Sequence, residues 1–146
     1  MKRILGIDYG TKRIGLAISD PMRIIASALK FVPNNDDAID EILNIAKKYE
    51  VEAIVIGIPL NLKGERAIKS EEVNEFIEKL REKSNLKIIE WDERFTTAIA
   101  KKTMLEMGLK KKQRQDRTRI DSMSAAILLQ SYLNSNLNVK NESRDS

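Results

Sequence analysis

The sequence contains no cysteine and no histidine. Without cysteine there can be no disulfide bond and no thiolate metal site, and without histidine there can be no imidazole base and no histidine-ligated zinc. Chemistry at an active site would therefore depend on carboxylates, hydroxyls, lysine and arginine. Carboxylate oxygens are ligands that hard cations such as Mg²⁺ or Mn²⁺ prefer, so these absences favour one group of cofactors.

Long apolar runs and a signal sequence are also missing. The N-terminus reads MKRILGIDYG, and no run reaches the ~18 apolar residues that a membrane span needs. We therefore expect a cytoplasmic protein without a membrane partner. A length of 146 residues with 42% hydrophobic content fits one domain, which we place at residues 1–135 and which a polar, disordered tail follows at 136–146.

The spacing of apolar residues predicts a mixed α/β order. Apolar runs at 3–9, 14–19 and 24–32 predict three antiparallel strands, with Gly10 relieving the first turn. The remaining pattern predicts a helix at 35–50, a strand at 53–58, a helix from about 70, a strand at 86–91, and helices at 96–108 and 119–133. We expect an α/β fold with a five-stranded mixed sheet, three antiparallel strands and then two parallel ones, flanked by helices.

Three acids stand at the ends of apolar elements, where surface acids are unusual. Asp8 ends the first strand, Glu93 follows the last strand in WDERFTT, and Asp121 opens the apolar final helix in IDSMSAAILL. Because the ends of parallel strands meet at one edge of an open sheet, we expect these acids to converge there.

The position of Asp121 depends on how the final helix packs. At helical spacing this acid shares a face with Ser124, Ala125 and Leu128, so it points inward if that face packs on the sheet. The small residues at 124–126 would allow the helix backbone to approach the sheet closely.

Three inward carboxylates need a counter-charge. Like charges a few ångströms apart repel by about 4 kcal/mol per pair at an effective dielectric near 20, so the cluster requires protons or cations. A divalent metal could bind phosphate oxygens and activate water at such a site. Each acid alone has another interpretation. Asp8 could form a turn, and Glu93 could pair with Arg94. Asp121 could complete a capping box with Thr118.

The net charge of +4 is concentrated in the C-terminal half, above all in the segment 110–119. This segment, KKKQRQDRTR, has six basic side chains against one acid. A polyanionic partner fits this composition, but a solvated charged loop is the more frequent case. Its basic members are Lys110, Lys111, Lys112, Arg114, Arg117 and Arg119. Because the segment directly precedes Asp121, we expect it to position nucleic acid through phosphate contacts.

Four motifs resemble one known family in their order along the chain. GIDYGTKRIGLAISD, VIGIPLNLKGE, DERFTTAIA and IDSMSAAILLQSYL are similar to the YqgF family of Holliday junction resolvases, also described as pre-16S rRNA nucleases. Together they cover essentially the whole chain apart from the tail. The resemblance implies a ribonuclease H-like fold. It also implies a metal-dependent endonuclease that acts on structured nucleic acid, either at the 5′ end of precursor 16S rRNA or at a Holliday junction.

The resemblance places the catalytic and metal-binding residues at Asp8, Glu93 and Asp121, which the strand-end pattern also selects. It implies one or two Mg²⁺ or Mn²⁺ ions, with Asp8 bridging the ions and Glu93 and Asp121 each binding one. Asp92 and Asp116 are the candidates for a fourth acid.

Polar residues beside these acids are expected to contact nucleic acid. Outside the basic segment they are Thr11, Lys12, Arg13, Asn61, Lys63 and Arg94. Arg94 could equally hold Glu93 in place.

The motif VIGIPLNLKGE is expected to form a loop at the substrate edge of the sheet. Gly57, Pro59 and Gly64 would shape this loop, and Asn61 and Lys63 would offer polar contacts. A plain connection between a strand and a helix is an equal alternative.

Two other functions stay open. A non-catalytic nucleic-acid-binding module could keep the fold, although a pure binder gains nothing from anionic groups that face phosphate. The first motif also resembles the phosphate-binding hairpin of actin-like ATPases, which need a second related domain. Precursor rRNA and branched DNA both offer suitable phosphodiesters, and the chain could be a monomer or the homodimer that two symmetric cuts would favour.

Overall fold

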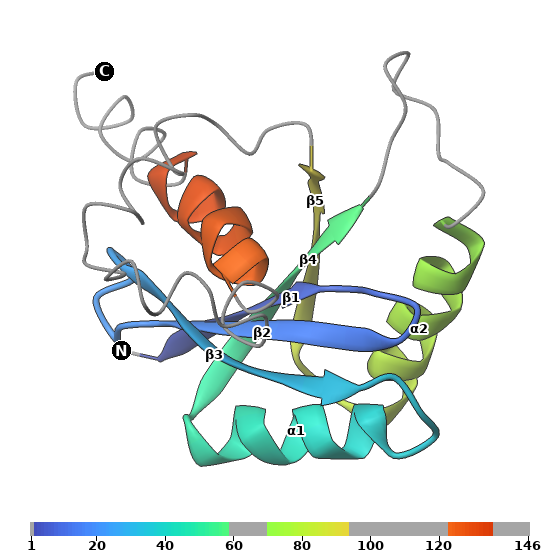
Figure 1. Cartoon of the computed structure of the whole chain (residues 1–146). Helices are drawn as coiled ribbons and strands as arrows, with labels where there is room; N and C mark the ends of the chain where they lie inside the picture. Colours follow the sequence, from blue (N-terminus) through green and yellow to red (C-terminus); the bar gives the residue numbers. More distant parts are fainter. Residues whose placement is uncertain (1, 59–69, 94–122, 136–146) are drawn as a thin grey trace.

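The computed structural model describes residues 2–58, 70–93 and 123–135 (Figure 1). The labelled elements are β1 (Arg3–Asp8), β2 (Arg13–Ser19), β3 (Ala26–Pro33), α1 (Ala38–Lys48), β4 (Val51–Ile58), α2 (Ser70–Lys83) and β5 (Lys87–Asp92). A further helix occupies residues 123–135 and is called helix 123–135 below. The helix expected at 96–108 lies outside the described residues. Among the helices of the described ranges, none is both long and apolar enough to cross a membrane.

The strands form one five-stranded sheet in the order β3-β2-β1-β4-β5. The pairs β3–β2 and β2–β1 are antiparallel, whereas β1–β4 and β4–β5 are parallel. The predicted mixed sheet is therefore confirmed. Because β1, β4 and β5 run in the same direction, their carboxyl ends lie at one edge of the sheet, which we call the carboxyl edge.

Helices cover both faces of this sheet (Figure 1). The apolar residues of α1 and α2 form one core cluster with Leu5 and Ile7 of β1. Helix 123–135 forms a second cluster that includes Ile4 of β1. Successive side chains of a strand point to opposite faces, so Asp8 is on the same face as Ile4 and therefore on the side of helix 123–135.

Helix 123–135 lies close against β1 at Gly6. A Cβ atom on Gly6 would stand 2.8 Å from Cβ of Leu129 and 3.3 Å from the carbonyl oxygen of Ala125. Ala125 and Ala126 are fully buried, as the expected close approach requires. Ser124 is exposed, so its expected place on the buried face was wrong. One residue turns a helix by about 100°, which takes Ser124 away from the face that Ala125 presents to the sheet.

The direction of helix 123–135 follows from its contacts at the two ends of the sheet. Leu128 lies beside Gly57, near the carboxyl end of β4. Further along the helix, Gln130 accepts a hydrogen bond from the amide of Ala26 and donates one to the carbonyl of Ile24. Ala26 begins β3, at the edge where β1 also begins. The helix thus runs away from the carboxyl edge.

The strand β3 begins at Ala26, later than the apolar pattern predicts, because residues 20–25 form a turn held by polar contacts. Oδ1 of Asp20 accepts hydrogen bonds from the amides of Ile24 and Ile25, both at 2.8 Å. Desolvation acts to raise the pKa of Asp20, but its backbone hydrogen bonds outweigh this effect and the pKa lies below its ordinary value. The apolar side chains of Ile24 and Ile25 are exposed as a result.

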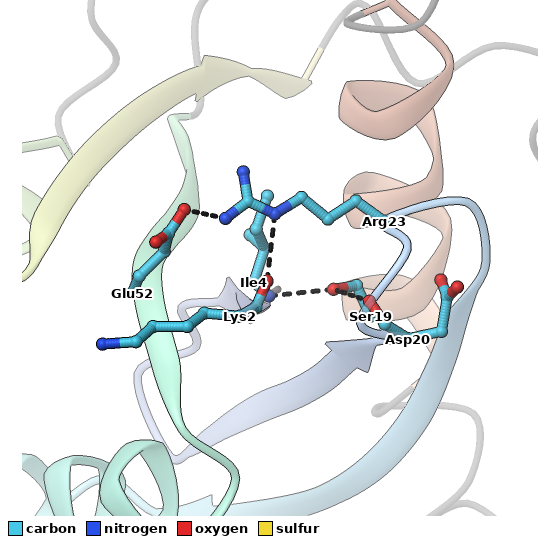
Figure 2. Close-up of polar contacts among 6 residues, drawn as sticks. All are labelled: Lys2, Ile4, Ser19, Asp20, Arg23 and Glu52. Carbon is cyan, nitrogen blue, oxygen red and sulfur yellow. Dashed lines mark hydrogen bonds and ion pairs between the residues drawn. The ribbon is translucent and has the colours of Figure 1, made fainter.

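Arg23 connects this turn to the start of β1 and to β4 through two side-chain contacts (Figure 2). Its backbone has a positive φ of 59°, which non-glycine residues rarely adopt. The side chain donates a hydrogen bond to the carbonyl of Lys2 and forms an ion pair with Glu52. Nearby, the hydroxyl of Ser19 accepts a hydrogen bond from the buried amide of Ile4 at 2.8 Å. The two contacts of the Arg23 side chain help to hold its positive φ in place.

The helix predicted at 35–50 begins only at Ala38. Asp37 stands at its N-cap, and Asp40 and Glu41 occupy its first turn. The amide of Ala38 donates to the carbonyl of Asn35, so a turn precedes the helix.

Candidate active site

Asp8 and Glu93 come from strands that are not neighbours. Asp8 is the last residue of β1, and Glu93 directly follows the last residue of β5. A hydrogen bond joins their side chains. The structure therefore brings two of the three acids selected from the sequence together at the carboxyl edge.

The environment of Glu93 disfavours its negative charge. Burial raises the pKa of Glu93 above its ordinary value, the charge of Asp92 raises it further, and the hydrogen bond with Asp8 acts in the opposite direction. A hydrogen bond between two carboxyl groups requires a proton on one of them. The pair can therefore hold a proton, or it can exchange that proton for a cation that both carboxylates bind.

A pocket of ≈ 210 Å³ opens at these carboxylates. It is lined by Asp8, Tyr9, Gly10, Thr11, Glu72, Val73 and Glu93. The turn after β1, the first turn of α2 and the end of β5 thus share one cavity. The sequence pattern did not single out Glu72, because acids are common in the first turn of a helix and only the packing of α2 brings this one to the pocket.

The turn between β1 and β2 is held in one shape beside this pocket. Asn34 donates a hydrogen bond from its side chain to the carbonyl of Gly10 at 2.8 Å and one from its amide to the carbonyl of Lys12 at 3.0 Å. A Cβ atom on Gly10 would overlap the carbonyl oxygen of Arg13, so only glycine fits. The side chains of Thr11, Lys12 and Arg13 are exposed. Their contact with nucleic acid stays a prediction.

Gly57 lies inside β4, where the strand predicted at 53–58 places it, and not in the loop that it was also expected to shape. It pairs with Trp91, and the β4–β5 pairing continues to Ile58 and Asp92. A Cβ atom on Gly57 would stand 2.9 Å from Oε1 of Glu93. The space above Gly57 is therefore occupied by the Glu93 side chain.

Several residues selected from the sequence lie outside the described residues. They are Pro59, Asn61, Lys63, Gly64, Arg94, Asp116, Thr118, Asp121 and the basic residues of segment 110–119. Asp92, a candidate fourth acid, is half-buried in β5. Within the described ranges, no three acids stand close enough to hold one metal ion together. The described part of the site is therefore the pair formed by Asp8 and Glu93.

Two solved resolvases share this fold. Thermus thermophilus RuvC, solved in complex with a Holliday junction substrate, superposes with a TM-score of 0.61 at 13% identity, covering 93% of this chain and 97% of that chain. The fowlpox virus resolvase in complex with Holliday junction DNA gives a TM-score of 0.56 at 16% identity, covering 92% and 99%. The chain has the ribonuclease H-like fold of these resolvases, as the sequence motifs implied.

Sequence comparison defines the family. The family model described as "RuvX: Holliday junction resolvase" matches residues 2–135. A protein of Sulfurihydrogenibium sp. is 44% identical over 135 residues, covering 91% of this chain and 90% of the relative. A protein of Flavobacterium johnsoniae is 45% identical over 139 residues, covering 92% and 98%. Both carry the name "Putative pre-16S rRNA nuclease". The chain belongs to this nuclease family, which confirms the predicted family and enzyme class.

Proposed function

We propose that this chain is a metal-dependent endonuclease that hydrolyses phosphodiester bonds in structured nucleic acid, with Asp8, Glu93 and Asp121 as its catalytic carboxylates. The observation that carries the proposal is the contact between Asp8 and Glu93 at the carboxyl edge of the sheet. Two acids that meet in a pocket destabilise the folded state, because their charges repel each other and lose hydration. Such pairs are typical of functional sites.

The residues at this edge fit a divalent cation. The donors are carboxylate oxygens, which Mg²⁺ and Mn²⁺ prefer, and Gly57 leaves room for one of the two carboxylates. Asp8 and Glu93 would hold one or two such ions. When bound, a divalent cation neutralises charge on the phosphate oxygens and acidifies the attacking water.

Asp121 would complete the set of carboxylates. It lies outside the described residues, two positions before helix 123–135. The N-terminal end of this helix points toward the end of the sheet where Asp8 and Glu93 meet. That direction supports the assignment of Asp121.

Exposed basic residues would bind the phosphate backbone around these acids. Lys12 stands in the turn beside the pocket, Arg13 begins β2, and Thr11 lines the pocket itself. The basic segment 110–119 would bind a further stretch of backbone. Such contacts hold the substrate in register but carry no sequence information.

Precursor 16S rRNA is our first candidate for the substrate. The relatives at 44% and 45% identity carry the rRNA nuclease name, whereas the two resolvases solved with junction DNA share only 13% and 16% identity. A four-way DNA junction is the second candidate, because this fold accommodates such DNA in those resolvases.

The proposal is tested by cleavage assays of the purified chain on precursor 16S rRNA and on four-way DNA junctions, side by side, with Mg²⁺ or Mn²⁺. Cleavage should require the cation and should disappear in Asp8→Asn, while circular dichroism shows that this variant is folded. A pure binding module would show no cleavage and would bind nucleic acid equally well or better with Asp8→Asn. ATP hydrolysis without nucleic acid would instead favour the actin-like alternative.

A further inference from the structure

The contact between Asp8 and Glu93 spans the strand that separates them. In the sheet order, β4 lies between β1 and β5. Neighbouring strands are about 4.8 Å apart, so the backbones that carry these two acids are separated by roughly 10 Å. Side chains as short as those of aspartate and glutamate can bridge this distance only by lying flat across β4.

Gly57 is the residue of β4 that lies beneath this crossing. Ala53 and Val55 of β4 belong to the core cluster of helix 123–135, and strand alternation puts Gly57 on the same face. A Cβ atom on Gly57 would stand 2.9 Å from Oε1 and 3.0 Å from Cγ of Glu93. Both distances are shorter than a normal contact with a Cβ atom, so the Glu93 side chain occupies the volume that any larger residue would fill.

Helix 123–135 closes the space above Gly57 on the side away from the sheet. Cδ1 of Leu128 would stand 3.0 Å from the same Cβ atom. Glu93 therefore has little room to rise over a side chain at position 57, because helix 123–135 covers this part of the sheet.

We propose that Gly57 is a positioning residue for the metal site, whose missing side chain provides the path by which Glu93 reaches Asp8. This role rests on the proposed function, in which both carboxylates bind a divalent cation. Gly57 itself touches neither the cation nor the nucleic acid. It sets where the carboxylate of Glu93 stands.

The substitution Gly57→Ala tests this role. The added methyl group displaces the Glu93 carboxylate, and changes to the residues that orient metal ligands typically weaken metal affinity about 10- to 100-fold. We expect a loss of that size in Mn²⁺ affinity, measured by isothermal titration calorimetry without nucleic acid. In cleavage assays kcat should fall while KM stays unchanged, because the surface that binds nucleic acid is untouched.

A matched control is Val55→Ala, which alters a buried residue on the same strand and face, two residues before Gly57. It should lower the melting temperature but leave Mn²⁺ affinity at the wild-type value. The double variant Gly57→Ala/Leu128→Val removes the crowding by Leu128 and serves if Gly57→Ala alone does not fold. Its Mn²⁺ affinity should stay low, because the methyl group still overlaps Glu93.

The results separate this inference from the proposed function. Wild-type Mn²⁺ binding that Asp8→Asn abolishes supports the metal site. If Gly57→Ala then binds Mn²⁺ with wild-type affinity, the positioning role of Gly57 is overturned and the metal site still stands. Recovery of affinity in the double variant would also overturn it, because Glu93 would then reach Asp8 over a side chain at position 57. If the wild-type chain binds no divalent cation, the metal site and the role of Gly57 both fail.

Discussion

Gln130 offers the sharpest test of how helix 123–135 is held on the sheet. This residue is 2% exposed. Oε1 accepts a hydrogen bond from the amide of Ala26 at 2.9 Å, and Nε2 donates to the carbonyl of Ile24 at 2.9 Å and to Oδ1 of Asn134 at 3.0 Å. Leucine has a similar volume but no polar group, so Gln130→Leu removes these hydrogen bonds without leaving a large cavity.

The cost of Gln130→Leu comes mainly from the amide of Ala26, a fully buried residue. A buried donor left without a partner costs about 1–3 kcal/mol, whereas the carbonyl of Ile24 is only partly buried and can turn to water. We expect the free energy of unfolding to fall by about 2 kcal/mol. For a chain of this length, that loss lowers the melting temperature by about 4–8 °C.

Urea denaturation followed by circular dichroism measures this effect, with an unchanged m-value as the sign of two-state unfolding. Asn134→Ala is the control, because it removes one half-buried partner of Gln130 and should cost less than about 1 kcal/mol. Gln130→Glu keeps an acceptor for Ala26 but buries a charge, so its stability should recover as the pH falls and the carboxyl group becomes protonated. A Gln130→Leu variant as stable as the wild type would refute the reasoning.

Two further predictions concern the carboxyl edge and the packing of helix 123–135. The pKa of Glu93 is higher in the folded chain than its ordinary value of 4.5, so the folded state binds more protons between the two values and stability falls as the pH rises. Without metal, Glu93→Gln should therefore be more stable than the wild type at neutral pH, and denaturation scans should show this advantage vanish below pH 4.5; lower stability at neutral pH would contradict it. Gly6→Ala should destabilise the chain by about 1–3 kcal/mol in urea denaturation, because its Cβ atom would stand 2.8 Å from that of Leu129. An unchanged urea midpoint would contradict this, since helix 123–135 would then move aside at no cost in stability.

Most of the fold could be predicted because hydrophobic periodicity is a local property. Alternating or continuous apolar runs place the strands, and a period near 3.6 places the helices, wherever the rest of the chain lies. One error falls where polar contacts override that pattern. Ile24 and Ile25 look like strand residues, but the carboxylate of Asp20 binds both of their amides and keeps them in a turn.

The candidate site could be predicted in part for a similar reason. Asp8 and Glu93 follow apolar runs, and a charge at the end of a buried strand is visible in the sequence alone. Glu72 is not visible in this way, because its approach to the pocket depends on the packing of α2. Gly57 falls within the predicted strand at 53–58, but its contact with Glu93 exists only because β5 pairs with β4.

The sequence by itself determined the family, the order of strands and helices along the chain, and two acids, Asp8 at the end of β1 and Glu93 just after β5. Only the tertiary structure decided that β4 separates those acids and that Gly57 opens the path between them. It also decided that Gln130 joins helix 123–135 to the start of β3. The physical reason is that periodicity and motifs involve residues close in the chain, whereas distances across a sheet are set by strand pairing and packing between distant segments.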